Sequence, residues 1–334
     1  MIENILSLLI WIPILSGLLL LFYKKENLVL NICNISINFI VFIISIILLL
    51  NFNDRSANFQ FIENVTWIPS LNIYYYLGVD AISVLLILLN TIIFLIVSLY
   101  NSTLVIKKRN QYYASFLIAN GLTIGVFSAL DAILFYIFFE ALLIPMFLII
   151  GIWGGANRIY ASIKFFIYTF LGSILLLISF LYINSSISSF NVLSFYKSSF
   201  SLAEQEWLFV AMAIAFAIKI PMFPFHTWLP DAHVEAPTSG SVVLAAILLK
   251  VGAYGFIRYV IPVVPSGAQS LDMYFIVLSL IAIVYVGIVA ISQNDMKKLI
   301  AYSSISHMGF VTLGFFIIFQ LFENTFNSQD LIIS

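Results

Sequence analysis

Long apolar runs, each of about 20 residues, follow one another along almost the whole chain. A run of roughly 17–25 apolar residues is long enough to cross, as a helix, a hydrocarbon core of about 30 Å. Of the 334 residues, 63% are hydrophobic and 9% are charged, and the mean hydropathy of +1.11 lies outside the range of soluble globular domains. We therefore predict an all-α, polytopic membrane protein of about ten transmembrane helices. The predicted spans are residues 5–22, 28–50, 81–106, 112–128, 132–152, 161–183, 207–222, 239–260, 273–292 and 299–321.

The sequence carries no motif for a redox or nucleotide site. Its single cysteine, Cys33, excludes a disulfide within the chain and any metal or iron–sulfur site made only of cysteines. There is no glycine loop for phosphates, no nucleotide fingerprint and no haem motif. The net charge of -1 gives no indication of a nucleic-acid partner. We expect no cofactor, no metal and no nucleic acid on this chain, with the lipid bilayer as its surroundings.

The basic residues predict the orientation of the chain, because cytoplasmic or matrix connectors carry an excess of Lys and Arg. Two longer polar connectors, residues 51–79 and 184–206, separate some of the spans. If the spans alternate in direction, one side receives Lys24, Lys25, Lys107, Lys108, Arg109, Arg158, Lys164, Lys297 and Lys298. The other side receives only Arg55, Lys197 and Arg258. This bias predicts that the first side faces the cytoplasm or matrix and that the amino terminus lies on the periplasmic or intermembrane side.

Four ionisable residues fall deep within predicted spans: Glu140, Lys219, Lys250 and His307. At a rise of about 1.5 Å per residue, Glu140 and Lys219 lie about 14 Å and about 18 Å below the outer edge. Lys250 and His307 lie about 16 Å and about 12 Å from the inner edge. All four are near the midplane, where a lysine costs at least about 2.5–3.5 kcal/mol. If their helices are neighbours, the four side chains form a row parallel to the membrane.

Such a row suits proton transfer. Glu140 and Lys219 can neutralise each other, which offsets the cost of burial. Lys250 has no second deep carboxylate, so burial favours its neutral amine and lets it alternate between amine and ammonium. The imidazole of His307 ordinarily titrates near neutrality. Hydroxyl groups that could hold a chain of water lie nearby on Tyr302, Ser303, Ser304 and Ser306. Alone, the Glu–Lys pair could simply pin two helices and His307 could be a packing residue, but four groups at one depth favour a pathway.

Two prolines, Pro221 and Pro224, closely follow Lys219. Each proline removes a backbone donor and breaks or kinks a helix. Irregular backbone at membrane depth occurs where protein encloses it or where it lines a water-filled cavity, and broken helices mark ion sites in transporters. The alternative is that a proline merely ends the helix, as Pro224 and Pro230 could do. Because the break lies within two residues of a buried lysine, we favour the functional interpretation and predict a broken helix near Lys219–Pro224.

The next segment, HTWLPDAHVEAPTSG, contains His226, Asp231, His233 and Glu235. Their spacing matches no zinc pattern. The segment lies at the predicted inner edge of the membrane, where polar caps and water entry are expected. We interpret it as a connection between helices or a proton-collecting entrance rather than a metal site, and the connection is the favoured of the two.

Three stretches of sequence resemble one known family: FYIFFEALLIPMFLIIGIWGG, AIKIPMFPFHTWLPDAHVEAPTSGSVVLAAILLKVGAYGFIRY and KKLIAYSSISHMGF. They are similar to the antiporter-like membrane subunits of proton-pumping NADH:quinone oxidoreductase (respiratory complex I), in particular to the type called chain M or subunit 4. The resemblance runs from about residue 77 to residue 316, and the stretch HTWLPDAHVEAPTSGSVVLAA is highly specific. Related cation/proton antiporters share the FHTWLPDA theme but usually differ after it.

The resemblance implies two inverted five-helix repeats, each with a broken helix. It implies three amino-terminal helices in residues 1–110, a complete first repeat in 111–260 and the start of a second, partial repeat in 261–334. Matched to the family's motifs, Glu140 and Lys219 resemble the paired carboxylate and lysine of the first half-channel. Lys250 resembles the central lysine, and His307 resembles the histidine that leads into the second repeat. Because the chain stops at Ser334, the expectation is a chain that is truncated or completed by a separate polypeptide.

The resemblance also implies proton translocation driven by quinone reduction elsewhere in the complex. NADH, FMN, iron–sulfur clusters and quinone would then be used by other subunits. The partners would be other membrane subunits, including neighbouring antiporter-like ones, in a bacterial or mitochondrial inner membrane. Two alternatives remain: a sodium or potassium/proton antiporter subunit that uses the same deep groups, and a truncated scaffold that assembles without transport. The HVEAPTSG stretch favours the respiratory complex over the antiporter.

Overall fold

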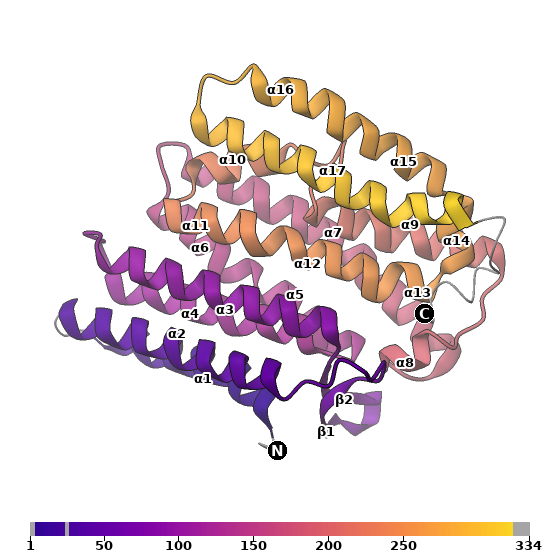
Figure 1. The fold of residues 1–334 in the computed structure, drawn as a ribbon, viewed down its shortest axis with the longest axis horizontal. Coiled ribbons are helices and arrows are strands. Elements are labelled where there is room, and N and C mark those ends of the chain that lie inside the picture. The colour runs from indigo at the N-terminus through magenta and orange to yellow at the C-terminus, as the bar shows by residue number, and fades with distance from the viewer. Residues whose placement is uncertain (1–3, 24–26, 323–334) are drawn as a thin grey trace. The chain divides into compact units, whose positions relative to one another are not determined.

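The computed structural model describes residues 4–23 and 27–322. The chain forms two compact units. The first contains Met1–Gly154 and Pro237–Val243, and the second contains Gly155–Ala236 and Leu244–Ser334. Figure 1 shows the helices and strands of both units with their labels.

Within the described residues, eight helical segments are long and apolar enough to cross a membrane. They are Ile5–Phe22, Leu28–Leu50, Ala81–Ser102, Ala132–Trp153, Arg158–Ile187, Thr238–Val263, Asp272–Ile291 and Met296–Leu321. The other two predicted spans are also helical, at Arg109–Ser128 and Leu202–Lys219. The first of these begins with a polar turn, and the second carries two glutamates besides Lys219, which makes both less apolar than the rest. The chain is a multi-pass membrane protein, as its composition predicts.

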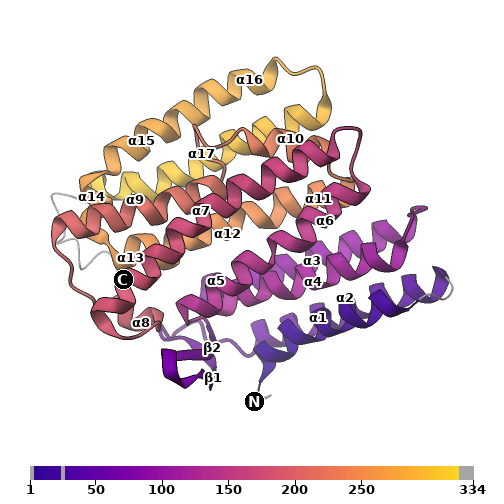
Figure 2. The ribbon, with the colours of Figure 1, turned by 180° about the vertical axis from the view of Figure 1, so that it is seen from behind.

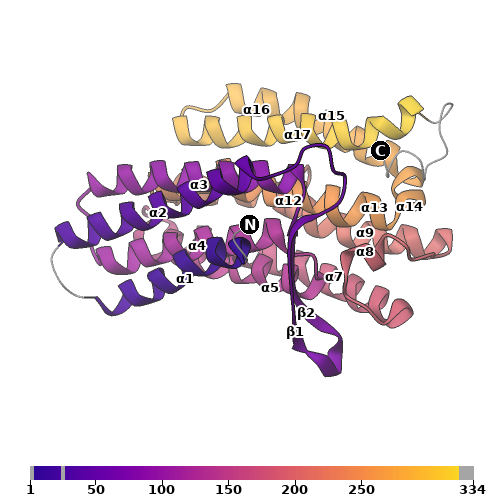
Figure 3. The same cartoon turned by 60° about the horizontal axis from the view of Figure 1, so that its bottom comes forward.

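The first unit combines long helices with one β-hairpin. Its helices are α1 (Ile5–Phe22), α2 (Asn27–Leu50), α3 (Ala81–Ser102), α4 (Arg109–Ser128), α5 (Ala132–Ala141), α6 (Leu143–Trp153) and α11 (Thr238–Val243). The antiparallel strands β1 (Gln60–Ile68) and β2 (Ile73–Val79) are joined by the 3-10 turn η1 (Pro69–Leu71) and lie side by side in Figure 3. Helix α1 packs on α4, and α2 packs on α3. The sequence predicts only a polar connector at residues 51–79, so the hairpin is a finding of the structure.

The hairpin holds the starts of two helices. The first backbone amides of a helix have no partner within it, and a carboxylate there also interacts favourably with the helix dipole. Glu63 on β1 is buried and accepts a hydrogen bond from the backbone amide of Leu6 in α1 (2.8 Å). Asp131, at the start of α5, accepts hydrogen bonds from the amides of Leu134 in α5 (3.1 Å) and Tyr74 on β2 (3.2 Å). The hairpin therefore fixes the amino-terminal ends of α1 and α5 within the first unit.

Buried asparagines join α2, α3 and α4. The amide nitrogen of Asn120 on α4 donates to the side-chain oxygen of Asn38 on α2 (2.9 Å). The side-chain oxygen of Asn120 accepts from the amide nitrogen of Asn90 on α3 (2.7 Å). All three asparagines are at most 2% exposed. Amide hydrogen bonds between membrane helices hold the helices together, so these three residues stabilise this part of the first unit.

The second unit is helical over its described residues. Its α-helices are α7 (Arg158–Ile187), α8 (Val192–Phe195), α9 (Leu202–Lys219), α10 (Trp228–Glu235), α12 (Leu249–Gly255), α13 (Ile261–Val263), α14 (Pro265–Ser270), α15 (Asp272–Ile281), α16 (Gly287–Ile291) and α17 (Met296–Phe322). Three π-helical turns interrupt the longer runs: η2 (Leu244–Leu248), η3 (Phe256–Val260) and η4 (Ala282–Val286). Helix α7 packs against α9 and α10, and Figure 2 shows these helices from the reverse side.

Helix α17 is fixed to α15 and η4 by hydroxyl groups. The hydroxyls of Ser279 on α15 and Thr312 on α17 lie 2.8 Å apart. The hydroxyl of Ser306 on α17 donates to the backbone carbonyl of Ile283 in η4 (3.0 Å). Four aromatic rings, whose paired centroids are 4.8–6.4 Å apart, extend this packing to α9 and η3. They belong to Phe209, Phe256, Phe275 and Phe316.

Candidate functional site

The helix that carries Lys219 ends at that residue. Helix α9 stops at Lys219 and α10 starts at Trp228, so residues 220–227 form the break that the prolines predict. The side chain of Lys219 is 1% exposed. A cation at the carboxyl-terminal end of a helix interacts favourably with the helix dipole, which offsets part of the cost of burying this lysine.

Nearby groups form hydrogen bonds with the backbone at the break. The indole N–H of Trp228, a buried side chain, donates to the backbone carbonyl of Ile218 (2.8 Å). The backbone amide of Met222 donates to the carbonyl of Ala217 (2.8 Å). Because a buried polar group without a partner is costly, these bonds stabilise the irregular segment. The break is therefore a defined structure within the second unit.

Lys250 lies on α12, directly after the π turn η2. Its Nζ donates a hydrogen bond to the backbone carbonyl of Ala245 inside that turn (2.9 Å). Its side chain is half-buried. Single π turns within α-helices are frequent at functional sites, and η2 follows this pattern if Lys250 takes part in proton transfer.

The break and α12 approach each other closely at Gly252. A Cβ atom added to Gly252 would lie 3.1 Å from the Cβ of Lys219 and 3.0 Å from the backbone nitrogen of Ile220. Only a glycine leaves room for this approach. Because successive residues of an α-helix are about 100° apart around its axis, Lys250 and Gly252 project from nearly opposite faces. Lys219 and Lys250 are therefore anchored on different sides of α12.

His307 lies on α17, which packs against α12 in the same unit. The adjacent Ser306 faces the π turn η4, whereas His307 itself is on the exposed side of α17. Two of the hydroxyl groups that we predicted as holders of water are already bonded to backbone carbonyls. Ser306 donates to Ile283, and Ser304 donates to Ile300 (2.9 Å). In the described chain Ser306 therefore holds α17 against η4, whereas Ser304 bonds back to its own helix.

Glu140 belongs to the first unit. It lies near the end of α5, just before the chain enters α6, and one of its carboxylate oxygens is buried. The pairing of Glu140 with Lys219 stays a prediction. The second unit thus brings together the helices of three of the four candidate residues, Lys219, Lys250 and His307, because α12 packs against both α9 and α17.

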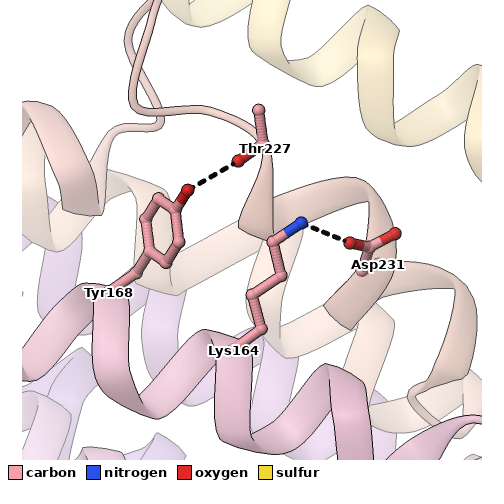
Figure 4. Close-up of polar contacts among 4 residues, drawn as sticks. All are labelled: Lys164, Tyr168, Thr227 and Asp231. Atoms are coloured by element: carbon pink, nitrogen blue, oxygen red, sulfur yellow. Dashed lines mark hydrogen bonds and ion pairs between the residues drawn. The ribbon is translucent and has the colours of Figure 1, made fainter.

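Among the basic residues that the orientation prediction counts with the connectors, six lie within helices instead: Arg109, Arg158, Lys164, Arg258, Lys297 and Lys298. Arg258 lies in η3 and is 6% exposed. Its Nε donates to the hydroxyl of Tyr254 (3.1 Å), and its guanidinium carbon is 5.2 Å from the centroid of that ring. A guanidinium is weakly hydrated and stacks on aromatic faces, which lets it enter a helix interior. Lys164 lies in α7 and forms an ion pair with Asp231 on α10 (2.6 Å), shown in Figure 4.

The segment that contains α10 is bound to its surroundings by several polar contacts. Next to the ion pair in Figure 4, the hydroxyls of Tyr168 and Thr227 lie 3.0 Å apart. The carboxylate of Glu235 accepts a hydrogen bond from the backbone amide of Asn157 (2.8 Å). The Nζ of Lys297 donates to two backbone carbonyls at the end of α10, the nearer at 2.9 Å. These contacts favour the interpretation of this segment as a connection between helices.

The two histidines of this segment, His226 and His233, are both buried. Burial lowers the pKa of His226, and the positive charge of Lys164 lowers it further. Burial and then the charge of Lys297 lower the pKa of His233 in the same way. Among the residues that the structure describes, no group of three or more His, Cys, Asp or Glu side chains is placed to hold a metal ion. The neutral imidazoles fit packing positions at the end of the helices.

Comparisons with known proteins agree with this arrangement of helices. The family model described as NADH:quinone oxidoreductase/Mrp antiporter, TM matches residues 129–327. The chain is 44% identical over 320 residues to NADH-quinone oxidoreductase subunit M of Rickettsia bellii, which covers 93% of this chain and 65% of that protein. It is 42% identical over 313 residues to NADH-ubiquinone oxidoreductase chain 4 of Arabidopsis thaliana, which covers 93% and 63%. The chain thus spans a little under two thirds of the length of these relatives.

A solved structure has the same fold. A chain of respiratory complex I from Thermus thermophilus with bound NADH superposes with a TM-score of 0.82 and 26% sequence identity. The match covers 96% of this chain and 72% of that chain. The resemblance seen in the three sequence stretches is confirmed, and the family model extends over more than half of the 334 residues. The chain belongs to the NADH:quinone oxidoreductase/Mrp antiporter transmembrane family.

Proposed function

We propose that this chain is a membrane subunit of an NADH:quinone oxidoreductase and moves protons across the membrane while quinone is reduced elsewhere in the complex. The relatives named subunit M and chain 4 support this proposal. The observation that carries it is the buried Lys219 at a helix break, packed against the helix that bears Lys250 beside a π turn. An ionisable residue inside a membrane protein is a functional candidate by default, and here two occur on adjoining helices.

In this proposal Glu140 stabilises the ammonium form of Lys219. When the carboxylate moves away or is neutralised, the buried ammonium loses its compensating charge and gives up its proton. Lys250 accepts that proton, and His307 passes it on. Because Lys219 and Lys250 are anchored on different sides of α12, the proton travels around α12 through water or during a movement of α12.

The proposal assigns the redox chemistry to other subunits. NADH, FMN, iron–sulfur clusters and quinone would bind there, and this chain would contribute no cofactor site. Its partners would be other membrane subunits, including neighbouring antiporter-like ones, in a bacterial or mitochondrial inner membrane. The amino terminus would lie on the periplasmic or intermembrane side. Residues 1–110 would form three amino-terminal helices, residues 111–260 the first repeat and residues 261–334 the start of the second.

The test removes the charge of Lys250 and measures coupling. Lys250→Met keeps a long flexible side chain but cannot carry a proton. In membrane vesicles that contain the assembled complex, we expect fewer protons moved per NADH oxidised. Lys197→Met is the matched control, because Lys197 is exposed in a connector of the same unit, and it should leave the ratio unchanged. An unaltered ratio in Lys250→Met, with normal amounts of assembled complex, would refute the proposal.

A cation/proton antiporter is the second candidate, because the family description includes the Mrp antiporter. Vesicles that contain the full chain, without NADH or quinone, would then exchange protons for sodium or potassium. Such exchange, lost in Lys250→Met, would favour the antiporter. A third outcome, normal assembly with no contribution to transport by any of the four candidate residues, would identify the chain as a scaffold.

A further inference from the structure

A cavity of about 530 Å³ lies in the first unit, outside the residues proposed for proton transfer. It is formed where α3 ends and α4 begins, and residues from the end of α6 and the start of α11 complete its wall. Its lining combines two lysines, two aromatic side chains and several aliphatic ones. Among the residues that the structure describes, no carboxylate lines it. The cavity therefore offers positive charge and apolar surface together.

The positive charge comes from Lys107 and Lys108, both exposed. Within the described ranges neither ammonium group has a hydrogen bond or ion pair, so both are available to a ligand. The next residue, Arg109, differs in this respect. Its guanidinium donates to the side-chain oxygen of Asn31 on α2 (3.1 Å) and to the backbone carbonyl of Leu104. Arg109 thus stabilises the loop, and the two lysines remain free to bind an anion.

The aromatic side chains hold the loop that carries Lys107 and Lys108. The indole N–H of Trp153 donates to the backbone carbonyl of Lys107 (2.7 Å). The rings of Trp153 and Tyr112 meet edge to face, with centroids 5.0 Å apart. Trp and Tyr gather at the boundary between lipid tails and water, where their rings lie at headgroup level. From Trp153 in the lining of the cavity we infer that the cavity lies at the depth of a lipid headgroup.

The apolar side chains make the cavity suitable for a lipid rather than for a small anion. Val105 is fully exposed, and Ile152 at the end of α6 is 41% exposed. Both line the same cavity as the two lysines. Inorganic phosphate would use the lysines alone, whereas a phospholipid would place its phosphate on the lysines and its acyl chains along Val105 and Ile152.

We propose that this cavity binds an anionic phospholipid on the cytoplasmic or matrix side of the membrane. Lys107 and Lys108 contact the headgroup phosphate, Trp153 and Tyr112 pack beside the glycerol region, and Val105 contacts an acyl chain. Basic pockets between membrane helices on this side are suited to acidic headgroups. This site is independent of proton transfer and goes beyond the function proposed above.

The experiment measures lipid binding to the full chain in a neutral detergent by native mass spectrometry. Phosphatidylglycerol and phosphatidylcholine are titrated separately. Each lysine near a membrane surface contributes about fivefold to the affinity for anionic lipid, so Lys107→Gln with Lys108→Gln should weaken phosphatidylglycerol binding by about 30-fold. Phosphatidylcholine binding should not change. Val105→Asn should also weaken phosphatidylglycerol binding, and inorganic phosphate at equal concentration should not displace the lipid from the unaltered chain.

The matched control is Lys24→Gln with Lys25→Gln, which removes an adjacent lysine pair from another connector on the same predicted side. It should leave phosphatidylglycerol binding nearly unchanged. Equal losses of phosphatidylglycerol affinity in the two double variants would show diffuse electrostatic attraction and overturn the proposal. Displacement of the lipid by inorganic phosphate at equal concentration would also overturn it. Absence of lysine-dependent lipid in the complex purified from membranes would show that a neighbouring polypeptide fills the cavity, and this result would also overturn it.

Discussion

Trp228 holds the end of α9, so replacing it should loosen the helix break beside Lys219. Its indole N–H donates to the carbonyl of Ile218 at 2.8 Å, and its side chain is 0% exposed. Phenylalanine in its place would keep the ring contact with Phe165, whose centroid is 5.3 Å away, but would donate no hydrogen bond. The carbonyl of Ile218 would lose this partner in a buried position.

The size of the effect follows from two changes at Trp228. A buried acceptor that loses its partner costs about 1–3 kcal/mol. The smaller ring leaves a void of about 40 Å³, which at about 24 cal/mol per Å³ adds about 1 kcal/mol. We therefore expect Trp228→Phe to lower the free energy of unfolding by about 2–4 kcal/mol. Under the proposed function it should also lower the number of protons moved per NADH oxidised by the assembled complex, because Lys219 would no longer be held at a fixed position.

Unfolding can be followed by circular dichroism as sodium dodecyl sulfate is titrated into detergent micelles of the purified chain. Trp207→Phe is the matched control, because it makes the same chemical change at a side chain that is 78% exposed on α9. Its effect should stay within about 0.5 kcal/mol. If Trp228→Phe lowers the free energy of unfolding no more than Trp207→Phe does, the hydrogen bond to Ile218 does not stabilise the break and the reasoning is wrong.

Three further predictions use the same titration. Gly309→Ala places a methyl group 3.0–3.2 Å from three atoms of α15 and η4, whereas the methyl group of Gly314→Ala meets nothing within 4 Å. Gly309→Ala should lower the free energy of unfolding by about 1–3 kcal/mol, and Gly314→Ala should raise it by up to about 1 kcal/mol. Equal effects of the two substitutions would contradict the packing argument. In a double-mutant cycle, Lys164→Met and Asp231→Asn should couple by only about 0.2–1 kcal/mol, because their side chains are 20% and 36% exposed; a coupling well above that range would show a more enclosed pair. Burial lowers the pKa of His226, so the unfolded chain binds more protons between the folded pKa and about 6.5. The free energy of unfolding should therefore fall as the pH drops below about 7 and level off below the folded pKa, and His226→Gln should reduce this slope.

The helices could be predicted from the sequence because the length of an apolar run is a local property. The predicted spans 5–22 and 28–50 coincide with the observed segments Ile5–Phe22 and Leu28–Leu50. Features within a span were not predictable in this way. The run 132–152 divides into α5 and α6, and the run 239–260 contains two π turns. Such changes in hydrogen bonding depend on what packs against the helix, which a single sequence does not encode locally.

The sequence contains a signal for the β-hairpin that the prediction of a polar connector does not use. Residues 60–79 contain two short runs rich in aromatic and β-branched residues, separated by a turn at Pro69–Leu71, which is the usual pattern of paired strands. The helix-capping role of Glu63 could not be predicted from the sequence, because its partner Leu6 lies 57 residues earlier in the chain. A carboxylate in a polar connector is most often solvated, and only the folded unit shows that it caps a helix.

The sequence predicts a depth within the membrane for each candidate residue, a prediction that stays untested, but it does not predict the face of the helix. Counting residues at about 1.5 Å each places Lys219 and Lys250 at similar depths, which suggests a direct row of proton carriers. The close approach at Gly252 shows in addition which face of α12 each lysine lies on, since it anchors Lys219 on the face opposite to Lys250. An α-helix with its side chains is about 10–12 Å across, whereas a hydrogen bond spans about 3 Å. In the proposed pathway, a proton that passes between the two lysines therefore has to go around α12. The bond from Lys250 to the carbonyl of Ala245 lies at the π turn, so in the same proposal a shift of that turn would move Lys250 and control when the proton passes.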